Sequence, residues 1–239
     1  DIVKRGYFMK QNKEVSIHYL FWYFLIFSIL GLIIETVYCL VTSNTLESRK
    51  GLIWGPFCPI YGVCGALIIY ILSKLNCKTV IKLFFAGFLF GSVAEYILSY
   101  GLEAIYGMRF WNYDYLQFNL NGRICLLFSI YWGILSIVLI KFVKPFIDKI
   151  LDKIKPHKRN IIELGIFIFL CIDCLVTIWG IQTYQNRVVY GKTYTPQSNN
   201  IISQLRATIE NNYFTNERMS KIFPNLRIKT EDGEEIWIS

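Results

Sequence analysis

The stretch GLIWGPFCPIYGVCG, at Gly51–Gly65, places two prolines and four glycines at the start of a long apolar segment. Proline lacks a backbone N–H donor and glycine permits tight turns, so the stretch predicts a broken helix start. Within a bilayer, irregular backbone is stable only where it packs against protein or lines a water-filled cavity. We therefore expect a re-entrant or unwound segment that packs against the fourth apolar segment and the helices bearing Glu35 and Glu95.

The composition around this stretch is typical of a membrane protein. Of the 239 residues, 54% are hydrophobic, and these residues are concentrated in blocks. A soluble domain is about 45–50% apolar, and a transmembrane helix needs about 20 apolar residues. Five blocks meet this length: residues 19–41, 55–75, 80–105, 124–143 and 161–184. The sequence predicts an all-α membrane protein with five transmembrane helices within residues 18–184.

Basic residues in the short loops predict the orientation. Fourteen Lys and Arg residues flank one set of helix ends, whereas the opposite loops hold only Arg49, Lys50, Arg109 and Arg123. The richer side is expected to be cytoplasmic, so residues 1–17 lie inside and the polar tail, residues 185–239, lies outside a bacterial cell membrane. The tail predicts a short helix from Ile201 to Ile209 and a hairpin around Asp232-Gly233. The net charge of +8 then reflects membrane topology, and no nucleic-acid partner is expected.

The loop between the fourth and fifth predicted helices has an amphipathic pattern of its own. Apolar residues recur at helical spacing from Phe146 to Ile154, and Lys149, Asp152 and Lys153 occupy the other face. This pattern favours a basic helix at the cytoplasmic interface. It is either a passive surface helix or a docking site for a cytoplasmic partner.

Two pairs of apolar segments resemble each other. Gly31-x3-Glu35 in the first segment matches Gly91-x3-Glu95 in the third, and Ile60-Tyr61 in the second matches Ile130-Tyr131 in the fourth. The predicted topology runs both pairs in the same direction. We therefore expect two parallel helical hairpin repeats, related as the parallel repeats of some transporters are.

Acidic residues inside apolar segments are the candidate functional groups, because a charge at membrane depth usually faces a partner or a wet cavity. Glu35 and Glu95 are predicted at similar depth in the outer half of the membrane, and Asp173 is predicted at mid-span. The two glutamates form either structural ion pairs with arginines of the outer loops or an outward-facing polar pocket. The expected pocket residues are Glu35, Glu95, Arg49, Arg109, Arg123, Gly55, Pro56, Pro59, Tyr61, Gly62, Trp111, Tyr113 and Asp114.

The seven cysteines show no zinc-binding spacing, and the two histidines lie away from the intramembrane acids. Cys171 and Cys174 have the spacing of a redox pair, but their predicted mid-span position favours buried apolar packing. We expect no metal and no cofactor.

Five motifs together resemble a bacterial family of ABC-transporter permeases, type IV. They are Gly31-x3-Glu35, RKGLIWGPFCPIYG (49–62), GSVAEY (91–96), WNYD (111–114) and LNGRIC (120–125). The resemblance covers residues 19–145, with Lys50 inserted between Arg49 and Gly51 and with the acid of the tryptophan motif displaced to Asp114. It implies a transport-related membrane protein. The sequence contains no P-loop, so an ATPase subunit would be a separate partner, docked at Phe146–Ile154.

These observations predict a transport-related cell-membrane protein that is not an enzyme. Its expected partners are the lipid bilayer, an ATPase subunit or other cytoplasmic partner, and a second copy of the chain in a homodimer. One alternative is an accessory or sensory membrane protein that binds a partner through the loop helix or the tail. The other is a membrane-embedded enzyme with Glu35 or Glu95 as general base, for which the sequence offers no adjacent His or Ser.

Overall fold

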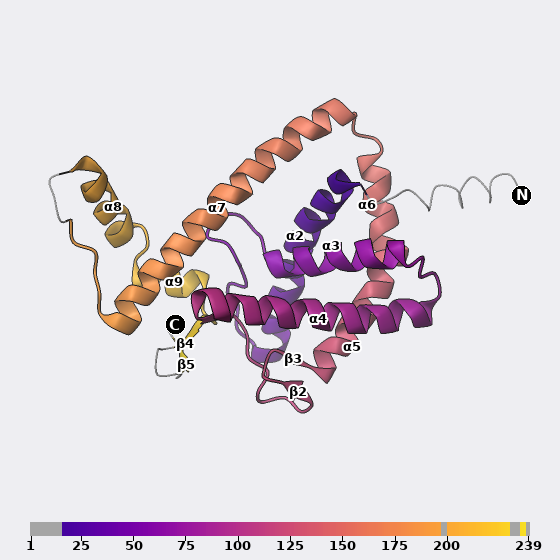
Figure 1. Cartoon of the computed structure of the whole chain (residues 1–239), viewed down its shortest axis with the longest axis horizontal. Helices are drawn as coiled ribbons and strands as arrows, with labels where there is room; N and C mark the ends of the chain where they lie inside the picture. Colours follow the sequence, from indigo (N-terminus) through magenta and orange to yellow (C-terminus); the bar gives the residue numbers. More distant parts are fainter. Residues whose placement is uncertain (1–15, 197–199, 230–234, 238–239) are drawn as a thin grey trace, which may run out of the picture. The chain divides into compact units, whose positions relative to one another are not determined.

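The computed structural model describes all residues except 1–15, 197–199, 230–234 and 238–239 (Figure 1). Within that part of the chain the fold is mostly helical. The described residues form two compact units: those within 16–30, 59–97 and 113–164 form the first, and those within 31–58, 98–112, 165–196, 200–229 and 235–237 form the second. The predicted N-terminal segment, 1–17, lies almost wholly outside the described residues.

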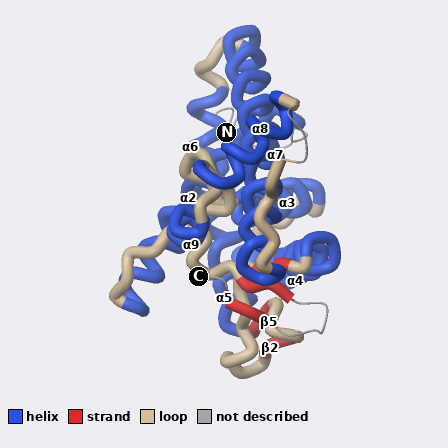
Figure 2. Tube along the Cα trace, turned by 90° about the vertical axis from the view of Figure 1, so that its left-hand side faces the viewer, coloured by secondary structure: helices blue, strands red, loops and turns tan. Residues whose placement is uncertain are grey.

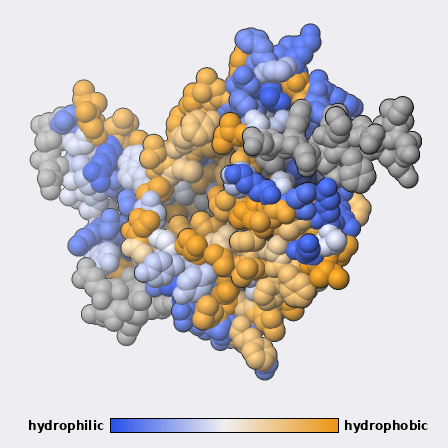
Figure 3. Space-filling model, turned by 45° about the vertical axis from the view of Figure 1, so that its right-hand side comes forward, coloured by the Kyte–Doolittle hydropathy of each residue, from blue (hydrophilic) through white to orange (hydrophobic). Residues whose placement is uncertain are grey.

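In the part of the chain that the structure describes, four helices are long and apolar enough to cross a membrane. They are α2 (Ile17–Ser43), α4 (Val80–Tyr106), the continuous helical stretch Leu126–Leu151 and α7 (Pro156–Tyr190). Large apolar side chains are exposed along them, such as Ile33 on α2 (53%) and Leu175 on α7 (69%). Hydrophobic atoms cover much of the face shown in Figure 3. Such a surface is stable in lipid and would be costly in water, so the chain is a membrane protein.

The second predicted span differs most from the sequence expectation. The helix α3 runs from Pro59 to Lys74, so it begins four residues after the expected start at Gly55 and has only 16 residues. Proline is well tolerated in the first turn of a helix, and a glycine with a positive φ angle of 70°, Gly55, lies just before it. The predicted break at the start of this helix is therefore confirmed, and it makes the helix shorter than the predicted span.

The predicted loop helix at Phe146–Ile154 is not separate from the fourth span. The helix α5 (Leu126–Val138) continues through a π-helical turn (Leu139–Val143) into α6 (Lys144–Leu151). Ile147 and Leu151 are buried, whereas Phe146 and Ile150 are exposed. The expected single apolar face is thus divided between a buried side and an exposed side.

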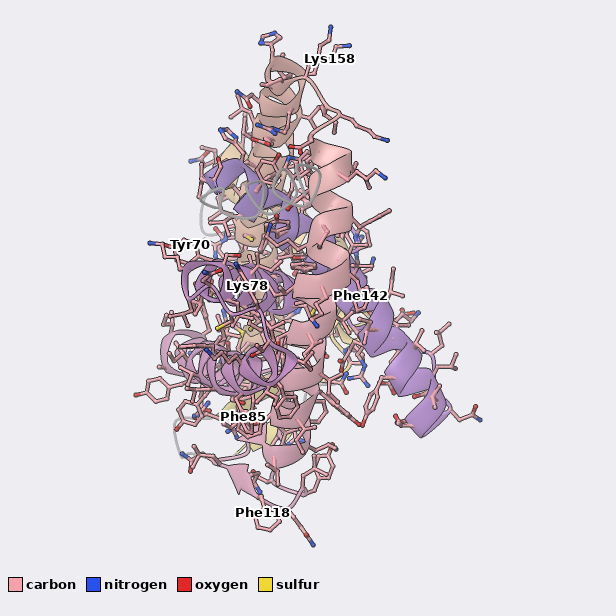
Figure 4. The ribbon with its side chains drawn as sticks, turned by 90° about the vertical axis from the view of Figure 1, so that its right-hand side faces the viewer. Tyr70, Lys78, Phe85, Phe118, Phe142 and Lys158 are labelled. Atoms are coloured by element: carbon pink, nitrogen blue, oxygen red, sulfur yellow. The ribbon has the colours of Figure 1, made fainter. Side chains whose placement is uncertain are left out.

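Glycines bring the helices of the first unit into close contact. Gly62 of α3 lies against Phe24 and Ser28 of α2, so a Cβ at Gly62 would lie 2.6 Å from the Phe24 carbonyl oxygen. Gly133 of α5 lies in the same way against Phe84 of α4. Small residues that let helix backbones approach are a common basis of helix association in membranes. Figure 4 shows α3 and α4 end-on, crossing the α5–α6 helix, with Phe118 and Lys158 at opposite ends of this unit.

This close contact predicts a large effect of Gly62→Leu. The added side chain would overlap backbone atoms that cannot move aside, so we expect a loss of at least about 2–3 kcal/mol of stability. Gly101→Ala on α4 is the matched control, because nothing lies within 4 Å of its Cβ position. Thermal unfolding in lipid nanodiscs measures the stability of both variants, and equal unfolding midpoints would contradict the predicted effect of the contact.

The second unit has a core of its own built largely by the tail. Its buried residues come from α7, from the segments that precede α3 and follow α4, and from the tail, which includes α9 (Asn216–Ile222) and the following strand. They are Ile53, Met108, Ile181, Tyr184, Phe214, Met219, Phe223, Leu226 and Ile228. The strand β1 (Met108–Arg109) pairs with β4 (Arg227–Lys229), which pairs antiparallel with β5 (Glu235–Trp237). Figure 2 shows these short strands in red. The predicted turn at Asp232-Gly233 lies outside the described residues.

The remaining elements are short. A second pair of strands, β2 (Asn119–Leu120) and β3 (Ile124–Cys125), forms a hairpin in the first unit. The helix α8 (Ile201–Asn212) begins at Asn200, whose side chain accepts the Ile202 N–H. The tail therefore contains two helices where the sequence predicted one.

Candidate functional site

The irregular stretch Gly51–Phe57 binds along α7. The carboxylate oxygen Oδ1 of Asp173 accepts the backbone N–H of Trp54 at 3.0 Å, and the hydroxyl of Thr177 accepts the backbone N–H of Ile53 at 3.0 Å. The Thr177 hydroxyl also donates to Asp173 Oδ1 at 3.3 Å. Side chains of α7 thus replace the backbone partners that the unwound stretch lacks, as burial of irregular backbone requires.

The sequence placed the stretch 51–65 against the fourth apolar segment and the helices that carry Glu35 and Glu95. Its second half fits this expectation, because Gly62 packs against α2 and the Tyr61 ring lies 6.0 Å from the Trp132 ring of α5. Its first half adds a partner that was not predicted, since the backbone N–H groups of Ile53 and Trp54 donate to α7, the helix of the fifth predicted span. The contact is deep in the helix, because Asp173 lies seventeen residues from both Pro156 and Tyr190.

Aromatic rings enclose the contact. The Trp54 ring stacks on Phe169 with centroids 6.3 Å apart, and Phe57 tilts against the same ring at 6.5 Å. The Trp54 indole N–H donates to the Tyr213 hydroxyl at 2.6 Å, which ties the loop to the tail. Gly180 leaves room for Ile53, whose Cδ1 would lie 2.8 Å from a Cβ at that position. We call Ile53, Trp54, Phe169, Asp173 and Thr177 the α7 loop site.

Asp173 is the most unusual group of the α7 loop site. It is fully buried, with 0% of its surface exposed. Its second carboxylate oxygen, Oδ2, has no hydrogen-bond partner among the residues that the structure describes. Buried acids within membrane helices are rare and usually mark a site of function.

A second polar cluster lies around Glu95 in the first unit. Glu95 is 6% exposed and accepts the Trp132 indole N–H at 2.7 Å and the Tyr113 hydroxyl at 2.9 Å, one on each carboxylate oxygen. Arg123, 7% exposed, lies 5.8 Å from the centre of the Tyr96 ring. The structure therefore brings together Glu95, Tyr113 and Trp132, with Arg123 beside Tyr96. Each oxygen of this buried carboxylate therefore has a hydrogen-bond partner, as buried polar groups require.

Glu35 has a different environment in the second unit. Its negative charge acts on Arg49, whose Nη2 donates to the Cys39 sulfur at 2.9 Å and lies 3.4 Å from Glu47. Burial lowers the pKa of Arg49, but the hydrogen bond to Cys39 and the negative charges of Glu35 and Glu47 outweigh it and raise the pKa overall. Arg49 therefore remains a cation beside Glu35.

The other predicted pocket residues are spread over both units. Arg109 is buried on β1 with its Nε 2.9 Å from Glu103, a partner that the sequence analysis did not single out. Trp111 is half-buried in the second unit, and Asp114 is exposed in the first. Gly55 and Pro56 belong to the loop bound to α7, whereas Pro59, Tyr61 and Gly62 belong to α3, where the Tyr61 ring lies 6.0 Å from the Trp132 ring.

Several groups that complete these sites were not predicted. Phe169 and Thr177 lie four residues before and four residues after the predicted acid Asp173, which places all three on one face of α7. That spacing was the available signal for the α7 loop site. Trp132 lay in an apolar run and gave no signal.

A third cluster was also missed, at the start of α2 and α7 in the first unit. Glu163 accepts the Trp22 indole N–H at 2.7 Å, lies 2.5 Å from His18 Nδ1 and lies 3.4 Å from Arg159. Only the spacing of Arg159 and Glu163, four residues apart on a helix, was visible in the sequence. Among the described residues, no three His, Cys, Asp or Glu side chains gather as a metal-binding group.

Comparison with known proteins adds the family. Residues 22–178 match the model of the family described as "Putative ABC-transporter type IV", which covers 157 of the 239 residues. No curated protein and no solved structure matches the chain. The match extends beyond the motifs that first suggested it, and it includes Asp173 and Thr177 on α7 as well as Glu95. The chain is therefore a membrane protein of the ABC-transporter type IV family.

Proposed function

We propose that the chain is the membrane-spanning, permease-type component of a transporter and that it is not an enzyme. The observation that carries the proposal is the α7 loop site, where unwound backbone meets a buried carboxylate halfway along an apolar helix. Transporters form ion and substrate sites from unwound backbone beside buried polar groups at membrane depth. The family match supports the same class of function.

Five spans built from two parallel hairpins remain part of the proposal. The support is a repeated packing contact: Gly62 lies against Phe24 in the first hairpin, and Gly133 lies against Phe84 in the second. Phe24 and Phe84 lie seven residues before the matching glycines Gly31 and Gly91. The short helix α3 would reach across the bilayer only together with the bound loop that precedes it.

The outward-facing polar pocket also remains a proposal, with the Glu95 cluster as its centre. Buried Glu95 and Arg123 and the ring of Tyr113 provide charges and aromatic surface next to the outer loop. We propose the bacterial cell membrane as the location, with the N-terminus in the cytoplasm and the tail outside. The separation of basic and less basic loops supports that orientation.

We propose a separate P-loop ATPase subunit as the cytoplasmic partner, docked on the exposed side of α6. Phe146 and Ile150 are exposed there beside Lys149. The tagged chain, captured from membranes of its native host, is expected to bring down this ATPase. Phe146→Ala with Ile150→Ala should reduce capture roughly 30-fold, since interface hot spots contribute about 2 kcal/mol or more.

The control for this capture is Tyr115→Ala, which removes an exposed aromatic side chain from the loop predicted to lie outside. It should leave capture unchanged. Stable capture of a partner that is not an ATPase would favour the alternative, an accessory or sensory protein. A homodimer is tested in the same preparation by capture of a second, differently tagged copy.

A further inference from the structure

The two oxygens of the Asp173 carboxylate have different environments. Oδ1 accepts the Trp54 N–H and the Thr177 O–H, whereas Oδ2 has no hydrogen-bond partner in the described part of the chain. The whole side chain is buried. Buried side-chain oxygens nearly always have a partner, so an unpartnered one calls for an explanation.

A proton on Oδ2 would remove the charge from this unpartnered, buried oxygen. Burial disfavours the ionised carboxylate, whereas the two hydrogen bonds to Oδ1 favour it. In the protonated form Oδ2 carries the proton and Oδ1 is the carbonyl oxygen, which still accepts both donors. All the donors that the structure shows are therefore on the one oxygen that accepts in either form.

Few other groups influence this balance. The positive charge of Lys50, at the start of the bound loop, acts on Asp173. Cys171 and Cys174 lie on α7 itself, and both are free thiols with exposed residue surfaces. Tyr213 of the tail is one contact away, beyond the Trp54 indole. None of these groups donates a hydrogen bond to Oδ2.

We propose that Asp173 is a reversible proton-binding site whose protonation loosens the Gly51–Phe57 loop. A hydronium ion transfers its proton to Oδ2: an O–H bond of hydronium breaks, an O–H bond at Oδ2 forms, water is released, and the charge of the site changes from −1 to 0. The Trp54 N–H and the Thr177 O–H then bond to a neutral acceptor, and such hydrogen bonds are about half as strong as those to a charged one. The inference goes beyond transport, because it concerns proton binding by this chain alone.

Amide hydrogen exchange of the full chain in lipid nanodiscs tests the proposal, from about pH 5 to about pH 9, where buried carboxylates titrate. After correction for the intrinsic exchange rate, protection of the Trp54 amide should fall roughly tenfold as the pH falls. The Gly51 amide, bonded to the Phe57 carbonyl within the loop, reports whether the loop itself unfolds. Its protection should stay constant.

Two variants separate protonation from other effects. Asp173→Asn is neutral at every pH, so its Trp54 protection should be flat and equal to the low-pH value of the wild type. Thr177→Val keeps the carboxylate, so Ile53 should lose protection while the pH dependence at Trp54 remains. If Asp173→Asn does not fold, the pH dependence of Trp54 protection in the wild type and in Thr177→Val still tests the proposal.

A flat wild-type profile would overturn the proposal, as would an unchanged titration in Asp173→Asn. Infrared difference spectra between high and low pH give a second readout, because protonation adds a carboxylic-acid carbonyl band that Asp173→Asn should lack. Capture of an ATPase subunit does not depend on this titration. Failure of the proton-binding proposal and failure of the proposed transport function are thus distinguishable.

Discussion

The variant Asp173→Leu is expected to lose about 2–4 kcal/mol of unfolding free energy. Leucine is larger than aspartate and accepts no hydrogen bond. The Trp54 N–H, buried against α7, then has no partner, and the Thr177 hydroxyl loses its acceptor. A buried donor without a partner costs about 1–3 kcal/mol.

Thermal or denaturant unfolding in nanodiscs measures this loss, with Asp173→Asn as the matched control. Asparagine keeps an acceptor oxygen at the Oδ1 position, so we expect a loss below about 1.5 kcal/mol, the contribution of a typical hydrogen bond. If leucine were as well tolerated as asparagine, the bound loop would not depend on the carboxylate. The α7 loop site would then be a packing contact and no more.

The second large effect is expected for Glu95→Leu, with a loss of about 3–5 kcal/mol. Two donors, the Trp132 indole N–H and the Tyr113 hydroxyl, lose their acceptor in a buried site. Each buried donor without a partner costs about 1–3 kcal/mol, so the loss of both has a large effect.

Two controls bracket the Glu95 result. Glu95→Gln keeps one acceptor oxygen and the shape of the side chain, so the protein should fold with a smaller loss. Asp114→Asn changes an exposed acid in the neighbouring loop and should shift stability by no more than about 0.5 kcal/mol. Equal unfolding midpoints for Glu95→Leu and Asp114→Asn would rule out a structural role for the buried carboxylate.

The apolar helices could be predicted from the sequence because their signal is local. A run of about 20 apolar residues is visible without knowledge of its neighbours, and the bounds of α2, α4 and α7 lie within six residues of the predicted ones. The family resemblance was also correct, because its motifs lie within short stretches of chain. The fourth span was predicted to end at residue 143, before a separate amphipathic helix, whereas α5 continues through the π-helical turn into α6.

The sites depended on contacts between distant residues and were predicted less well. Asp173 was identified as a mid-span acid, but its partner Trp54 is 119 residues away, and nothing in either segment specifies the pairing. Glu35 and Glu95 have matching sequence motifs yet different surroundings, an arginine with a thiol in one case and two aromatic donors in the other. Similar sequence thus predicted similar position and did not predict similar partners.

The continuous helix from Leu126 to Leu151 has a mechanical consequence. Its 26 residues span about 39 Å, which exceeds the hydrocarbon thickness of about 30 Å, so its last turns project beyond the lipid. Near its other end the same helix carries Trp132, whose indole N–H donates a hydrogen bond to Glu95. A movement of these last turns would therefore be transmitted along one continuous helix to Trp132 and from there to the carboxylate of Glu95.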